Sequence, residues 1–136
     1  HPGIIEKSFP SKDLIDLEKI ESIVNQSGYE PILLKEIIST SGFNPKRVGD
    51  LIHLLFAQGK VENLGNQFWL NRPNLDNVLS DISNYFRSKD ELTVADFKNI
   101  TGLSRKTAIP LLEYLDKNHF TVRHENVRVK GETLNG

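Results

Sequence analysis

Residues 103–120, LSRKTAIPLLEYLDKNHF, combine a capped amphipathic helix with a cationic first turn. Ser104 is a suitable N-cap, and apolar residues follow it at helical spacing. Arg105 and Lys106 stand at the start of the helix, where unpaired backbone N–H groups and the helix dipole attract anions. Cations there disfavour the isolated helix, and a bound phosphate would offset that cost. The stretch is typical of a nucleic-acid recognition helix, and the alternative is a solvated surface turn.

A weaker copy of this stretch lies 60 residues earlier, and it aligns without a gap. The offset of 60 pairs these residues: Ser41-Gly42-Phe43-Asn44 with Thr101-Gly102-Leu103-Ser104, Lys46 with Lys106, Leu51 with Leu111, Ile52 with Leu112, and Leu55 with Leu115. Further upstream, an offset of 62 pairs two apolar sets with helical spacing: Leu17, Ile20, Ile23 and Val24 with Leu79, Ile82, Tyr85 and Phe86. This similarity predicts a duplicated unit.

Each copy predicts three helices followed by two short strands. In the first copy we expect helices at 12–26, 33–40 and 44–58 and strands at 60–64 and 67–70. In the second copy we expect helices at 74–87, 93–100 and 104–118 and strands at 120–124 and 127–130. Two helices joined by a tight glycine-containing turn form a helix-turn-helix, and a hairpin after them is a wing. The predicted fold class is therefore α+β and helix-rich, with two tandem winged-helix domains.

Three local signals refine this prediction. Asn44 followed by Pro45 predicts a helix start. The breaker composition of Asn71-Arg72-Pro73-Asn74 predicts a short linker, which divides the chain into domains 1–72 and 73–136. Pro110 would occupy the sixth position of the last helix, where it costs about 3 kcal/mol, so we expect a kink or a late helix start there.

The composition is that of a globular protein: 38% of the 136 residues are hydrophobic and 26% are charged. No apolar run approaches the roughly 18 residues that cross a bilayer, and no signal pattern opens the chain, so we expect a cytoplasmic protein without membrane contact. The absence of cysteine excludes disulfides and cysteine metal sites. Because the chain starts with His1 instead of Met, we expect a fragment of a longer protein.

The charge is distributed unevenly although the net charge is only −1. Residues 98–130 carry seven cations and three anions, whereas the first 72 residues sum to −1. The cations of the second copy are Lys98, Arg105, Lys106, Lys117, Arg123, Arg128 and Lys130. Alternation along the wing strands places several of them on a common solvent face, and His124 could add a phosphate contact. Together they predict a groove with phosphate contacts on two sides.

Other residues are assigned no chemistry. We expect Phe68 and Trp69 to pack against a helix or the neighbouring unit instead of stacking on bases. His53, His119 and His124 lack metal-ligand spacing, so no metal site is predicted. Phosphate-loop, zinc-protease and nucleophile-elbow motifs are absent, so we expect neither catalytic residues nor a cofactor.

The second copy resembles the C-terminal winged helices of the bacterial selenocysteine-specific translation elongation factor, SelB. The resembling residues are Leu103-Ser104-Arg105-Lys106, Ile109-Pro110-Leu111-Leu112-Glu113-Tyr114-Leu115-Asp116, Phe120-Thr121, Arg123, Arg128 and Val129. The resemblance covers 93–131 strongly and 12–72 at the level of fold alone, where the penultimate winged helix, a spacer, would lie. The sequence departs from the family at Val122 and Val127, where a basic residue is often found.

The resemblance implies that the second domain binds the selenocysteine insertion hairpin (SECIS) of an mRNA during UGA recoding. A GTPase portion of the full-length protein would carry selenocysteinyl-tRNA to the ribosome, and the fragment itself would be a monomer. By the same resemblance, one group of residues would grip the hairpin near its loop and two wing arginines would close on it: Ser104, Arg105, Lys106 and Thr107, then Arg123 and Arg128. Unpaired bases are the usual targets of sequence-specific RNA readers.

Two other functions stay open. A DNA-binding regulator would insert the 104–118 helix into a major groove, although few base-reading Asn or Gln residues stand at its start. A protein-interaction module would carry its cations incidentally. Both nucleic-acid readings predict that affinity falls steeply with salt.

Overall fold

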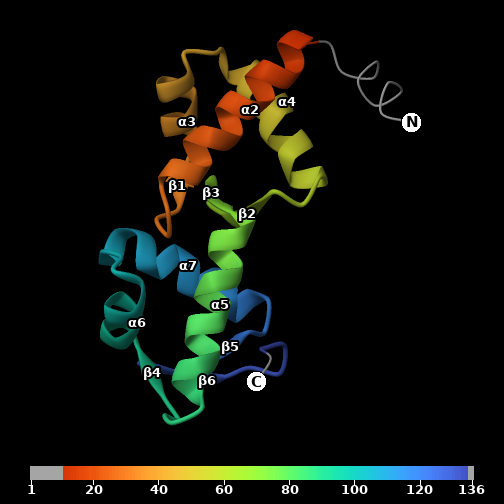
Figure 1. The fold of residues 1–136 in the computed structure, drawn as a ribbon. Helices are drawn as coiled ribbons and strands as arrows, with labels where there is room; N and C mark the ends of the chain where they lie inside the picture. The colour runs from red at the N-terminus through yellow and green to blue at the C-terminus, as the bar shows by residue number, and fades with distance from the viewer. Residues whose placement is uncertain (1–10, 135–136) are drawn as a thin grey trace, which may run out of the picture.

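The computed structural model describes residues 11–134, which form two successive groups of helices and strands (Figure 1). The first unit, residues 11–71, contains α2 (Ser11–Gln26), β1 (Ile32–Leu33), α3 (Leu34–Ser41), α4 (Pro45–Ala57), β2 (Val61–Gly65) and β3 (Phe68–Asn71). The second unit, residues 72–134, contains α5 (Arg72–Phe86), β4 (Leu92–Thr93), α6 (Val94–Thr101), α7 (Arg105–Lys117), β5 (Thr121–His124) and β6 (Val127–Lys130). The first ten residues of the predicted domain 1–72 lie outside the described residues.

Both units have the predicted helix-turn-helix followed by a wing. The turn in each depends on a glycine in the left-handed conformation, Gly42 with φ 77° and Gly102 with φ 76°. Glycine adopts this conformation without a steric penalty, so one helix ends and the next begins within a few residues. The hairpins β2–β3 and β5–β6 follow directly. The winged-helix fold and the offset of 60 for the recognition helices are therefore confirmed.

Each sheet has a third strand that the sequence did not predict. The strand orders are β1-β3-β2 and β4-β6-β5, with antiparallel pairing throughout. Ile32 pairs with Trp69, and Leu92 pairs with Arg128. Because β1 and β4 are only two residues long, they show no alternation that a sequence could reveal. Strand β4 nevertheless joins the start of α6 to the second wing.

The two recognition helices, α4 and α7, begin differently. The Asn44 side chain accepts a hydrogen bond of 2.8 Å from the Arg47 backbone N–H, and Pro45 occupies the first turn, as predicted. Ser104 also stands at an N-cap position with extended backbone, but its hydroxyl makes no capping bond. Its main-chain carbonyl accepts the first helical bond, from Ala108, at 2.8 Å. The position of this cap was predicted correctly, but the side-chain hydrogen bond expected of a serine N-cap is absent.

Helix α7 starts at Arg105 and continues through Pro110, so of the two expected outcomes the late start is wrong, and the kink stays a prediction. The reason lies in the buried face around the proline, formed by Thr107, Ala108, Leu111, Leu112 and Leu115. Burying a leucine side chain stabilises a fold by about 1.5–3 kcal/mol, so three buried leucines outweigh the cost of one proline.

Residues 71–74 form no linker. Asn71 ends β3 and caps α5, because its side chain accepts a 2.8 Å hydrogen bond from the Asn74 backbone N–H. Pro73 lies in the first turn of α5. Asn and Pro are common both at helix starts and in loops, so the sequence of residues 71–74 was misread as a linker. The boundary between domains 1–72 and 73–136 stays a prediction, but the chain crosses it without an irregular segment.

Strands β2 and β3 lie between the helices of the first unit and helices α5 and α7 of the second (Figure 1). Leu64, Phe68 and Leu70 of this first wing belong to the same buried cluster as the second-unit core, including Leu75 and Leu111. Two hydrogen bonds add to the junction: Asn74 Nδ2 donates to the Gly28 carbonyl at 2.8 Å, and the Tyr29 hydroxyl donates to Asp81 at 3.3 Å. The units are packed against each other.

Trp69 lies in the core of the first unit with 3% of its surface exposed. It makes edge-to-face contacts with His53 and Phe56 of α4. The expectation that Trp69 and Phe68 pack instead of stacking on bases is confirmed. No helix within residues 11–134 is long and apolar enough to cross a membrane.

The first helices of the units do not follow the expected offset. Their most buried apolar residues are Leu17, Ile20 and Val24 in α2, and Leu75, Val78 and Ile82 in α5. These sets lie 58 residues apart instead of 62. Both helices are apolar enough that several offsets give helical spacing, so periodicity alone selected the wrong one.

Candidate nucleic-acid interface

The start of α7 presents two positive charges. Arg105 and Lys106 are exposed, and the first turn contains no acidic residue. Neither side chain belongs to an ion pair formed among residues 11–134. The positive end of the helix dipole adds to these charges. This end of α7 therefore has a positive potential, and that it binds an anion stays a prediction.

The second wing brings its arginines together across the hairpin. Arg123 in β5 pairs directly with Arg128 in β6, and Thr121 pairs with Lys130. Directly paired residues share one face of a sheet, so Arg123, Arg128 and Lys130 lie on one face of the wing, but the predicted common solvent face is confirmed only for Arg123 and Lys130. Arg123 and Lys130 are exposed.

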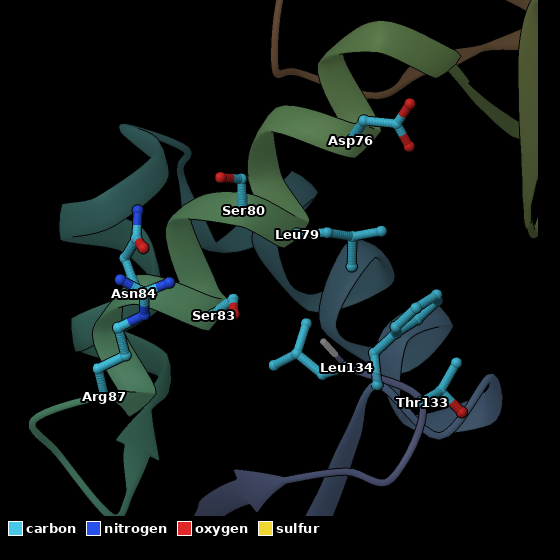
Figure 2. Close-up of a pocket in the computed structure, with 9 residues that line it drawn as sticks. Asp76, Leu79, Ser80, Ser83, Asn84, Arg87, Thr133 and Leu134 are labelled. Atoms are coloured by element: carbon cyan, nitrogen blue, oxygen red, sulfur yellow. The ribbon is translucent and has the colours of Figure 1, made fainter. Parts of the chain in front are cut away.

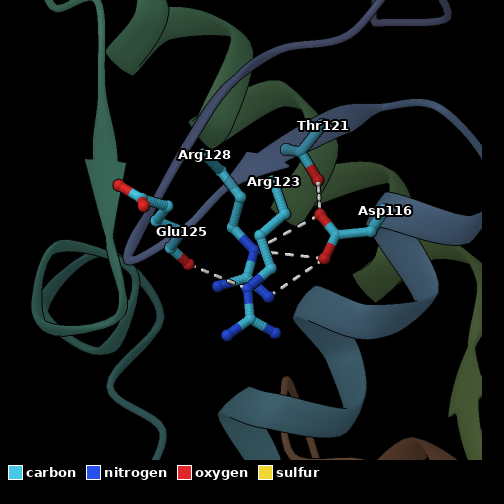
Figure 3. A network of polar contacts seen from close by, with 5 residues as sticks. All are labelled: Asp116, Thr121, Arg123, Glu125 and Arg128. Carbon is cyan, nitrogen blue, oxygen red and sulfur yellow. Dashed lines mark hydrogen bonds and ion pairs between the residues drawn. The ribbon is translucent and has the colours of Figure 1, made fainter.

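Arg128 departs from the prediction because its side chain is only 3% exposed. Its guanidinium forms a forked ion pair with Asp116 of α7, with Nη2 at 3.0 Å from Oδ2 and Nε at 3.2 Å from the same oxygen. The Thr121 hydroxyl donates to the other carboxylate oxygen at 2.6 Å (Figure 3). Arg128 is thus a buried, paired cation and not a solvent-facing one.

Arg123 remains available. Its Nε donates a 3.0 Å hydrogen bond to the Glu125 carbonyl, which orients the guanidinium. Its two terminal nitrogens make no hydrogen bond within the described part of the chain. A guanidinium held at Nε with its terminal nitrogens open suits a phosphate oxygen pair.

A hollow of about 380 Å³ lies between α7, the start of α6 and the second wing. Its lining residues are Thr93, Val94, Ala95, Arg105, Ile109, Arg123, Glu125, Asn126 and Arg128. Arg105 and Arg123 therefore line one groove from the recognition helix and from the wing, and that they contact phosphates there stays a prediction. Asn126 and residues 93–95 were not predicted from the sequence, because only the fold brings these segments beside α7.

Lys106 faces elsewhere. It lines a separate hollow at the junction with the first unit, together with Glu30, Glu36 and Phe68. Thr107 lines the same hollow but is only 5% exposed, and its hydroxyl donates to the Ser104 carbonyl at 3.5 Å. Thr107 therefore serves helix packing. Arg105 and Lys106 line different hollows, and the expected grip on the hairpin by residues 104–107 stays a prediction.

The remaining predicted contacts lie outside the groove lining. Lys98 is half-buried in the last turn of α6. His124 is exposed but pairs with Val127 on the wing face opposite to Arg123. Lys130 shares the face of Arg123 at the far end of β6. Across residues 11–134, no cluster of three or more His, Asp or Glu residues is placed to hold a metal ion.

Another hollow, of about 520 Å³, runs along α5 beside Phe120, Thr133 and Leu134 (Figure 2). Its lining contains one cation, Arg87, and one anion, Asp76. This balanced lining has no excess of positive charge for nucleic acid, so we do not include it in the candidate interface.

Comparisons with known proteins agree with this fold. Residues 84–129 match the family model described as elongation factor SelB, winged helix. A selenocysteine-specific elongation factor from Desulfomicrobium baculatum is 32% identical over 104 residues, covering 76% of this chain and 16% of the relative. The chain thus spans about a sixth of the length of that curated relative.

Two solved structures share the fold. The mRNA-binding domain of elongation factor SelB from E. coli, in complex with SECIS RNA, has a TM-score of 0.77 and 21% identity, covering 91% of this chain and 100% of that chain. A bacterial selenocysteine-specific elongation factor, EF-Sec, has a TM-score of 0.71 and 27% identity, covering 90% of this chain and 20% of that chain. The chain therefore belongs to the selenocysteine-specific elongation factor family, of which it is a winged-helix part.

Proposed function

We propose that this chain binds the SECIS hairpin of an mRNA through its second unit. The observation that carries this proposal is the pair Arg105 and Arg123, which face one groove from the recognition helix and from the wing. The solved domain with the same fold is in complex with SECIS RNA, which supports RNA over DNA as the partner.

The groove suits the end of a hairpin better than its stem. The major groove of an RNA stem is too deep and narrow for a helix to read, so sequence-specific readers use loops and bulges. Arg105 and Arg123 would hold phosphates on two sides of a turn in the RNA, with the start of α7 adding its dipole. Asn126 lies at the groove with an amide that offers both donors and an acceptor to an unpaired base.

Lys106 would have a secondary role. Because it lines the junction hollow together with Glu30 and Glu36, those carboxylates would make that hollow less attractive to a phosphate than the groove. We expect it to attract an RNA strand that leaves the groove toward the first unit, with a smaller effect on affinity than Arg105.

The first unit would act as a spacer, and the remainder of the protein would supply the other activities. We infer that the longer protein contains a GTPase portion that carries selenocysteinyl-tRNA, so that hairpin binding holds this cargo near the ribosome. In this division of labour the winged helices bind and do not catalyse.

A titration with three ligands tests the proposal: a SECIS-type RNA hairpin, the same hairpin with an altered loop, and a DNA duplex of equal length. The proteins are the unaltered chain and the Arg105→Ala, Lys106→Ala double variant. We expect tight binding of the native hairpin alone and its loss in the variant. A preference for DNA would indicate a DNA-binding module, and equal weak binding of all three ligands would indicate a protein-interaction module.

A further inference from the structure

The second wing is attached to α7 by a small buried network formed by Asp116, Thr121 and Arg128 (Figure 3). Asp116 is in the last turns of α7, whereas the other two residues lie on β5 and β6. One carboxylate therefore bonds both strands of the wing. Thr121 is 1% exposed and Arg128 is 2% exposed, so water competes weakly for these bonds.

The network borders the candidate groove, because Arg128 is one of the residues that line it. Arg123 lies on the same strand as Thr121 and is the paired neighbour of Arg128. Arg105 reaches the groove from the opposite end of α7. The position of Arg123 relative to Arg105 thus depends on how the wing is held to the helix, and Asp116 is the group that holds both wing strands.

We propose that Asp116 is a positioning residue of the RNA site, which fixes the wing through Arg128 and Thr121 so that Arg123 faces Arg105 across the groove. This inference rests on the proposed function. It assigns Arg128 to the support of the wing, because Arg128 borders the groove but its side chain is only 3% exposed and its charge is already paired with Asp116.

The substitution Asp116→Asn separates positioning from simple electrostatics, because the two predict opposite changes in RNA affinity. Asp116→Asn removes a negative charge close to an RNA site, so charge alone would leave binding unchanged or make it tighter. Positioning has the opposite consequence, because a loosened wing loses the Arg123 contact. The loss of one phosphate contact lowers affinity by roughly five- to eightfold at 0.1 M salt.

Glu113→Gln is the matched control. Glu113 lies on the same helix, is exposed, and takes part in none of the ion pairs among residues 11–134. The substitution removes the same charge without touching the wing, so we expect unchanged or slightly tighter binding.

A double-mutant cycle with Arg123→Ala shows whether Asp116 acts through Arg123. In that background the contact is already absent, so Asp116→Asn should cause no further loss beyond about twofold. A general loss of folding would persist in the double variant. Thr121→Val, which removes one hydroxyl bond and keeps the side-chain shape, should weaken binding in the same direction by less, and it replaces Asp116→Asn if that variant does not fold.

The experiment measures affinity for the SECIS-type hairpin and amide hydrogen exchange in the free proteins. We expect Asp116→Asn to bind more weakly and to exchange faster along β5 and β6. Binding as tight as that of the unaltered chain, exchange that does not change, or an undiminished loss in the Arg123→Ala background would each overturn the inference. If the unaltered chain fails to bind the hairpin, the proposed function is wrong and the inference is wrong with it. If the unaltered chain binds but Asp116→Asn binds equally tightly, only the positioning role of Asp116 is wrong.

Discussion

The two units share one fold but differ at the start of the recognition helix, where the basic residues are paired with carboxylates in the first unit and unpaired with carboxylates of the described residues in the second. In the first unit, Arg47 in the first turn of α4 bonds to Asp13 at 2.5 Å and Asp16 at 2.9 Å. Lys46 pairs with Asp50 at 3.4 Å. In the second unit, Arg105 and Lys106 lie outside every ion pair of the described residues.

The difference shows that fold and function are set by different residues. The apolar positions and the glycine turns repeat in both units and produce the same architecture. The acidic partners do not repeat: the position of Asp50 is occupied by Pro110 in the second unit. A duplicated winged helix can therefore keep its shape and lose or gain an anion-binding surface through a few carboxylates.

Salt dependence is the broadest test of this comparison. With Arg128 assigned to support, we expect three or four phosphate contacts. Hairpin affinity should then fall roughly 20- to 150-fold between 50 and 200 mM salt, by titration at four or more salt concentrations. A response flatter than tenfold would contradict a phosphate-binding second unit.

Removing the two groove arginines should make the second unit behave like the first. For Arg105→Ala combined with Arg123→Ala we expect hairpin affinity to fall roughly 25- to 60-fold at 0.1 M salt, because two contacts are lost. Lys46→Ala is the control in the first unit, at the position that corresponds to Lys106, and should leave affinity unchanged. An equal loss in the control would place the RNA on both units.

The starts of α6 and α3 offer a comparison of stability. Thr93 and Asp96 form a capping box at α6, whereas Leu33 at α3 makes no side-chain cap. Thr93→Ala should lower the free energy of unfolding by roughly 1 kcal/mol, measured by urea denaturation. Thr93→Ser preserves the capping oxygen and should cost less, and equal costs would show that the hydroxyl bond contributes nothing.

Tyr114 tests how closely the two units are joined. Burial, followed by the charge of Glu62 in the first wing, raises the pKa of Tyr114 to about 12. Because the unfolded chain releases this proton near the ordinary value of 10, the contribution is present below pH 10 and is lost as the pH rises toward 12. The free energy of unfolding from pH 9 to 12 should fall more steeply for the unaltered chain than for Tyr114→Phe. Parallel curves would contradict the burial of Tyr114 beside Glu62 at the junction of the two units.

The sequence predicted the elements of the fold because their signals are local. Asn44-Pro45, the glycine turns and the helical spacing of apolar residues all act within a few positions. Strands β1 and β4 were missed because two residues carry no periodicity. Asn71 and Pro73 were misread because a helix start and a linker share the same residue types.

The site was predicted less completely because it depends on distant pairings. Arg105 and Arg123 were found from charge at a helix start and on a wing strand. The burial of Arg128 depends on Asp116, which lies 12 residues away on another element. Lys106 lines a hollow with Glu30 and Glu36, which only the fold of the first unit brings to the junction.

The central claim is that the second unit alone contacts the RNA, at one end of α7 and at the wing. Backbone amide NMR shifts of the isotope-labelled chain, followed during titration with the SECIS-type hairpin, test it most directly. We expect the largest changes at 93–95, 104–106 and 123–126, and none at 45–47 in the first unit. Equal changes at 45–47, or changes confined to the hollow along α5, would contradict the account.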